Sequence, residues 1–157
     1  MKMVPVLILL GITAVAVAAD KEIKDIALSA AIYNKKITQE HMNALVDKYA
    51  DATGEAADSP LNRAAITFEL SVGLKDWSKK LGRYAKGLKN HQSVAYDPSF
   101  NELVTLYAKE TNHIIDTTCQ QAEVGLNAAS LLETWASKLK KYSEDLTVKA
   151  LKHPQSE

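Results

Sequence analysis

Apolar residues recur at spacings of three and four along most of the chain, the spacing that places side chains on one face of an α-helix. We find no sustained alternation of apolar and polar positions rich in β-branched residues, so the pattern does not favour strands. The periodic segments predict helices over residues 22–33 and 39–53, and a long helix over 60–90. The chain is therefore expected to be all-α.

Residues that begin and end helices support these boundaries. Thr38 is a candidate N-cap for the second helix, and Gly54 can adopt the left-handed conformation that helices favour just past their end. Ser59 followed by Pro60 gives an N-cap and a proline at the first helical position. The pair at 97–98, Asp followed by Pro, repeats this signal and predicts another helix start.

Residues 42–88 align without a gap with residues 100–146 at a constant offset of 58, which indicates an internal duplication. Fourteen of the 47 aligned pairs are identical, where composition would give about three or four. The repeat units are expected at about 38–90 and 96–148. The stripe of the long helix recurs, so that Trp77, Leu81, Tyr84 and Leu88 correspond to Trp135, Leu139, Tyr142 and Leu146.

The duplication predicts a break in the second unit. Residues 99–151 contain no proline and could form one helix of about 50 residues, an unusual length for a small domain. The offset of 58 places Asn112 on Gly54 and Thr117 on Ser59. Asn is the second choice for a left-handed helix end, and Thr is a capping residue, so we expect the helix to break between about 112 and 117.

Each unit then holds a short helix of about 14 residues and a long one of about 30, which span about 21 and 45 Å. If the two helices of a unit pack as a hairpin, much of the long helix extends beyond its partner. We expect these overhangs to pack stripe to stripe, with the N-terminal helix closing one side. The expected fold is a single domain, residues 20–157, built as a bundle of four main helices plus one.

The first 19 residues are typical of a secretory signal peptide. Lys2 precedes an apolar run over 4–17, and Ala16-Val17-Ala18 is a small-x-small cleavage site. The run is too short to span a bilayer as a helix, and no second apolar stretch follows, so no transmembrane anchor is expected. The mature protein is expected to begin near Ala19 or Asp20 and to be secreted.

Charge and cysteine content narrow the choice of partners. Removing Lys2 from 19 basic and 19 acidic residues leaves 18 and 19, a net charge of −1, which does not favour a nucleic-acid binder. Cys119 is the only cysteine, so no intrachain disulfide can form. It corresponds to Leu61, an apolar residue that favours a buried thiol over an intermolecular bridge.

Catalytic motifs are absent from the sequence, so we expect a protein that is not an enzyme and carries no cofactor. His113, Asp116 and Cys119 are spaced by three and could be metal ligands. Because the duplication makes Asp116 a capping residue in a turn, and no second cluster supplies further ligands, no metal site is predicted.

Six aromatic residues are matched between the units and are the candidate ligand-binding residues. Their hydroxyl and indole N–H groups need partners when buried, so they suit a pocket wall with an apolar body and polar tips. Core packing is the alternative interpretation. The six residues are Tyr49, Trp77, Tyr84, Tyr107, Trp135 and Tyr142.

A basic run on the first long helix, Lys79, Lys80, Arg83 and Lys86, is the candidate partner-binding face. It is either a solvated helix face or a contact for an anionic surface. Two functions remain open. One is a carrier of a lipid or other small hydrophobic ligand between the helices, and the other is a module, monomeric or weakly dimeric, that binds an extracellular protein or anionic glycan.

Overall fold

The structure is a computed structural model that describes residues 20–92 and 96–152. The expected signal peptide, residues 1–19, lies outside the described residues. Within them the chain forms five α-helices and no strand, which confirms the all-α prediction. The helices are α2 (Asp20–Tyr33), α3 (Gln39–Thr53), α4 (Pro60–Lys89), α5 (Pro98–Glu110) and α6 (Thr118–Lys152).

The predicted capping residues begin and end the helices. The Thr38 hydroxyl accepts a hydrogen bond from the backbone N–H of His41 at 3.1 Å, at the start of α3. Ser59 does the same for α4, accepting from the N–H of Asn62 at 3.2 Å. Gly54, with φ +72°, ends α3 in the left-handed conformation. These bonds satisfy backbone groups that a helix end leaves unpaired.

The predicted break in the second unit is confirmed. α5 ends at Glu110, Asn112 has φ +58°, and α6 begins at Thr118. The two helix ends use the same hydrogen bonds at an offset of 58. The N–H of Glu55 donates to the Ala50 carbonyl at 3.0 Å, and the N–H of His113 donates to the Ala108 carbonyl at 2.8 Å.

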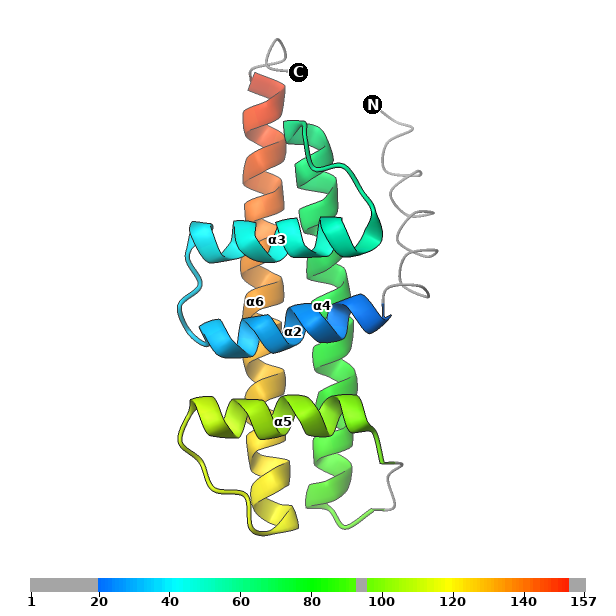
Figure 1. The fold of residues 1–157 in the computed structure, drawn as a ribbon, viewed down its shortest axis with the longest axis vertical. Helices are drawn as coiled ribbons and strands as arrows, with labels where there is room; N and C mark the ends of the chain where they lie inside the picture. The colour runs from blue at the N-terminus through cyan, green and yellow to red at the C-terminus, as the bar shows by residue number, and fades with distance from the viewer. Residues whose placement is uncertain (1–19, 93–95, 153–157) are drawn as a thin grey trace.

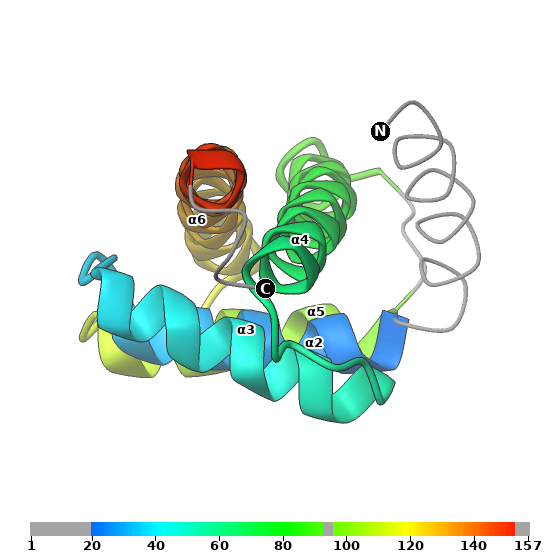
Figure 2. The same cartoon turned by 90° about the horizontal axis from the view of Figure 1, so that it is seen from above.

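Two layers make up the molecule. The long helices α4 and α6 run antiparallel, and α3, α2 and α5 lie across them one after another (Figure 1). All three short helices cover the same face of the long pair, as the view along the pair shows (Figure 2). The expected hairpin, with each short helix running alongside its long partner, was wrong.

Small residues along the α4–α6 contact explain this arrangement. A Cβ placed on Gly125 would lie 3.0 Å from the Cβ of Ala85, and one on Gly82 would lie 3.9 Å from that of Ala129. The two long helices therefore approach closely at these two points. The aromatic and leucine stripes instead face the short helices, which cover them.

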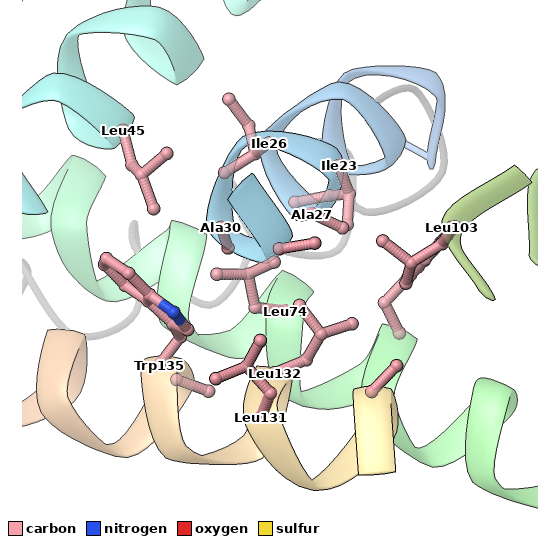
Figure 3. Packing of buried hydrophobic residues seen from close by; sticks show 14 of the residues in the cluster. Ile23, Ile26, Ala27, Ala30, Leu45, Leu74, Leu103, Leu131, Leu132 and Trp135 are labelled. Atoms are coloured by element: carbon pink, nitrogen blue, oxygen red, sulfur yellow. The ribbon is translucent and has the colours of Figure 1, made fainter. Parts of the chain in front are cut away.

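The N-terminal helix α2 covers the middle of the pair, between α3 and α5 (Figure 1). Ile26, Ala27 and Ala30 are fully buried, and α2 lies over Leu74 of α4 and Leu132 of α6 (Figure 3). One hydrophobic cluster draws side chains from all five helices. The expectation that this helix closes the core is confirmed.

Matched polar bridges tie each short helix to its long partner. The Arg63 guanidinium of α4 donates to Asn43 Oδ1 of α3 at 2.9 Å. At the offset of 58, Gln121 Nε2 of α6 donates to Asn101 Oδ1 of α5 at 2.8 Å. Arg63 also pairs with Asp47 at 2.9 Å, at the surface. The two units thus fix their short helices in the same way.

Cys119 is exposed, so the expectation of a buried thiol was wrong. Its counterpart Leu61 is itself 38% exposed, because this position lies at the outer start of each long helix. An apolar residue there did not indicate burial.

Of the helices described, none combines the length and the apolar character that crossing a membrane requires.

Candidate functional site

The six matched aromatic residues lie along the core and do not surround one common space. Tyr49, Trp77, Tyr107 and Trp135 are buried, while Tyr84 and Tyr142 are half-buried. Their polar tips find protein partners in two cases. Trp135 Nε1 donates to the Asn34 carbonyl at 3.0 Å, and the Tyr142 hydroxyl donates to Asn43 Oδ1 at 2.9 Å.

The two tryptophans have different surroundings despite their matched positions. Trp77 meets the edge of Phe100 at a centroid distance of 5.0 Å. Trp135 is fully buried, and its ring centroid lies 6.1 Å from that of the tilted Tyr33 ring. Tyr33 in turn stacks on His41 at 4.0 Å. Tyr33, the last residue of α2, therefore packs between Trp135 and His41.

An open depression of about 930 Å³, which we call the α5–α6 cleft, lies on the α6 side of the molecule. Three segments form it: the turn after α2 (residues 34–37), the end of α5 and the loop after it (107–113), and one face of α6 (127–138). Its apolar part consists of Ile37, Tyr107 and Leu131. Tyr107 is thus the one candidate aromatic residue among those that line it.

Basic and neutral polar groups complete the cleft. Lys35, His113 and Lys138 line it together with Asn34 and Thr134, and no aspartate or glutamate is among the residues described as its lining. His113 Nδ1 lies 2.7 Å from the Thr111 hydroxyl. Asn34 has φ +57°, and its Oδ1 is buried without a hydrogen-bond partner in the described part of the chain. The cleft combines an apolar wall with an electropositive rim.

The matched positions of the first unit carry more acidic residues, and α2 packs against α4 there. Ile23 of α2 packs on Gly73, where an added Cβ would lie 2.5 Å from the Ile23 Cδ1. Beside it Glu69 is half-buried, and its pKa is raised to about 7 by burial and by hydrogen bonding to Glu55. Burial, together with the charges of Glu69, Glu55 and Glu22, raises the pKa of Tyr49.

The basic run is divided between two surfaces. Lys79, Arg83 and Lys86 are exposed and line a groove of about 360 Å³ between α4 and α6, which Glu133 of α6 also lines. Lys80 lies apart from them, 3.1 Å from Asp76. It lines a depression of about 540 Å³ that also contains Trp77, Phe100, Lys24 and two aspartates, so the charges there are mixed.

The segment with His113, Asp116 and Cys119 forms the turn between α5 and α6. The capping residue is Thr117, whose hydroxyl accepts from the N–H of Gln120 at 3.1 Å, while the Asp116 N–H donates to Gln120 Oε1 at 2.8 Å. Across residues 20–92 and 96–152, no three His, Cys, Asp or Glu side chains are arranged to hold a metal ion.

Sequence reasoning missed most residues of the α5–α6 cleft, including Lys35, Leu131 and Lys138. The signal lay in the positions at which the two units differ. Asn127 stands at the position of Glu69, Leu131 at that of Gly73, and Thr134 at that of Asp76. Positions that are identical in the two units indicate the shared core. Positions that differ, such as these three, mark the cleft, which is lined by residues of the second unit and of the turn after α2.

Comparison with known proteins gives no match for this chain, whether to a protein-family model, a curated protein or a solved structure.

Proposed function

We propose that this is a secreted binding protein without enzymatic activity, which holds a small hydrophobic or amphipathic molecule in the α5–α6 cleft. The observation that carries the proposal is the cleft itself. Its volume of about 930 Å³ lies within the range of roughly 300 to 1,000 Å³ typical of small-molecule sites. Such sites usually combine an apolar wall with a few polar groups that orient the ligand, as Ile37, Leu131 and Lys138 would here.

The proposal assigns different roles to the matched aromatic residues. Tyr107 forms part of the cleft wall, and Trp135 lies behind it, bonded to the Asn34 carbonyl. Tyr49 and Trp77 are buried in the hydrophobic cluster, where core packing accounts for them. A ligand held between the long helices themselves would have to displace this packing, whereas the cleft is already open.

A variant that fills the cleft tests the proposal. Thr134 is exposed and lines the cleft, so Thr134→Trp should block it without disturbing the core. The matched control is Asp76→Trp, an exposed position 58 residues earlier on the α4 side. We expect the mature protein to bind the neutral fluorescent probe N-phenyl-1-naphthylamine, Asp76→Trp to bind it equally, and Thr134→Trp to lose roughly tenfold or more in affinity.

Equal binding by both variants would contradict the assignment to this cleft. Absence of probe binding by the unaltered protein, together with a bare polypeptide mass in native mass spectra of protein secreted from a eukaryotic host, would contradict small-molecule binding altogether.

A second candidate function follows from the groove between α4 and α6. Lys79, Arg83 and Lys86 lie together along this groove, which suits contact with an anionic glycan or an acidic protein surface. The variant Lys79→Glu with Arg83→Glu should change stability by less than about 0.5 kcal/mol, because both residues are exposed. It should abolish retention on immobilised heparin, and unchanged retention would exclude this face.

A further inference from the structure

We infer that the α5–α6 cleft selects an anionic amphiphile, a molecule with an aliphatic body that ends in a carboxylate or similar anionic group. This inference rests on the proposed function and names the ligand class for the same site. It follows from the juxtaposition of Lys35 and Lys138 beside the apolar wall of Ile37, Tyr107 and Leu131.

The two ends of α2 meet the two units differently. α2 crosses the middle of the α4–α6 pair between α3 and α5, with its first turns over α4 and its last turns over α6 (Figure 1). Its first turns contact the α4 side, where Ile23 packs on Gly73. Its last residues reach the α6 side, where the chain turns at Asn34 and leaves the cleft open.

Replacement of three carboxylates gives the cleft a different charge from the matched positions of the first unit. Glu55, Glu69 and Asp76 of the first unit correspond to His113, Asn127 and Thr134, all of which line the cleft. The residues that line the cleft therefore include no carboxylate that would repel an anion.

Lys138 lacks the acidic partner that its counterpart Lys80 has, because Thr134 stands at the position of Asp76. In the first unit Lys80 pairs with Asp76 four residues earlier, at 3.1 Å. The corresponding pair in the second unit is Thr134 and Lys138, and the Thr134 hydroxyl donates instead to the Ser130 carbonyl at 3.1 Å. Lys138 has no ion-pair partner among the residues of known position, so its ammonium group is available to a ligand.

Lys35, on the turn after α2, adds a second ammonium group to the lining of the cleft. Next to it, Asn34 also lines the cleft, and its carboxamide oxygen is buried without a hydrogen-bond partner in the described part of the chain. Two cationic side chains in the lining of a cleft that also has an apolar wall favour a ligand with an aliphatic body and an anionic end.

Competition between matched ligands tests this inference. Dodecanoate and 1-dodecanol carry the same aliphatic chain with an anionic and a neutral end, and each is used to displace N-phenyl-1-naphthylamine at pH 7.5. We expect dodecanoate to bind roughly tenfold or more tightly than 1-dodecanol at low salt, since each exposed charge contact is worth up to about a factor of five. High salt should reduce this preference.

Variants assign the preference to the two lysines. Lys35→Gln and Lys138→Gln should each weaken dodecanoate binding about threefold to fivefold and leave 1-dodecanol unchanged. The control is Lys80→Gln, at the position that matches Lys138, which should bind both ligands as the unaltered protein does. All three positions lie on the surface or close to it, so the variants should fold.

The outcomes separate the inference from the proposed function. Equal binding of dodecanoate and 1-dodecanol, unaffected by the lysine variants, would overturn the anionic selectivity and leave small-molecule binding intact. Failure of the probe and of both ligands to bind would overturn both. Preference for dodecanoate that is lost in Lys80→Gln but kept in Lys138→Gln would place the anion in the depression beside Trp77 and overturn the assignment to this cleft.

Discussion

At the scale of single residues, the half-buried carboxyl group of Glu69 on α4 should make the stability of the protein depend on pH. Burial and the neighbouring Glu55 raise the pKa of Glu69 from 4.5 to about 7, so the folded protein holds a proton that the unfolded chain releases. The stabilisation from this proton is fully present below pH 4.5. It decreases as the pH rises between 4.5 and about 7, and it is lost above that range.

We therefore expect the free energy of unfolding to fall between pH 4.5 and about pH 7, and Glu69→Gln to remove much of that fall. Glutamine keeps the size of the side chain and does not titrate, and the matched residue Asn127 is already an amide. Urea unfolding at a series of pH values measures the effect, with Glu133→Gln, an exposed position, as the control. An unchanged pH dependence in Glu69→Gln would show that this carboxyl group is not responsible.

The contact between Ile23 and Gly73 is a second test at the scale of single residues. Leucine, the residue found at the matched position 131, should clash with Ile23 when placed at 73, and we expect Gly73→Leu to cost about 1–3 kcal/mol. Ile23→Ala alone should cost about 2–5 kcal/mol. Because the smaller side chain makes room for the leucine, the double variant should lose less than the sum, by roughly 0.5 kcal/mol or more.

Denaturant unfolding of the four proteins in this cycle gives the coupling energy. The control cycle pairs Gly73→Leu with Ile26→Ala, since Ile26 is buried in α2 but is not among the atoms within 4 Å of a Cβ at position 73. Additive effects in the first cycle would contradict the packing of α2 on α4.

At the scale of elements, sequence could predict where the helices begin and end, because capping is local. Thr38, Gly54, Ser59 and Asn112 act within a few residues of their own position. Sequence could not predict how the helices cross. That depends on the small residues along the α4–α6 contact, such as Gly125 against Ala85, which meet only after the chain has folded. Helix lengths alone suggested hairpins, whereas the short helices lie across the long pair (Figure 1).

The end of α3 gives a prediction at this scale. Gly54 has φ +72°, and no atom lies within 4 Å of an added Cβ. A substitution there should therefore change stability only through the energy of the left-handed backbone conformation. Gly54→Ala should destabilise the protein by about 1–2 kcal/mol. Gly54→Asn should cost less, because Asn112 occupies the same conformation at the end of α5.

Thermal or urea unfolding measures both changes, and Gly82→Ala provides a control of opposite sign. A Cβ at Gly82 would make an ordinary contact with Ala129 at 3.9 Å, and alanine has the higher helix propensity. This variant should be unchanged or more stable by up to about 1 kcal/mol. Equal losses for Ala and Asn at position 54 would contradict the role of the left-handed conformation.

At the scale of the whole molecule, duplication produced two similar units, and a single α2 made them unequal. The repeat could be predicted from residues such as Trp77 and Trp135, which are identical and lie in the core of both units. The cleft could not be predicted in this way, because α2 has no counterpart in the alignment and its position across the axis follows from packing. The asymmetry of the site therefore arises from one helix that both units share.

The two tryptophans lie near different depressions, so their fluorescence can report separately where a ligand binds. Trp135 is bonded to Asn34 at the edge of the α5–α6 cleft, whereas Trp77 borders the depression with mixed charges on the α4 side. Dodecanoate in the cleft should therefore change the fluorescence emission of Trp77→Phe, which keeps only Trp135, and leave that of Trp135→Phe unchanged. Far-ultraviolet circular dichroism checks that both variants remain helical. An emission change confined to Trp135→Phe would place the ligand beside Trp77, in a site where Asp25 and Asp97 offset the nearby lysines.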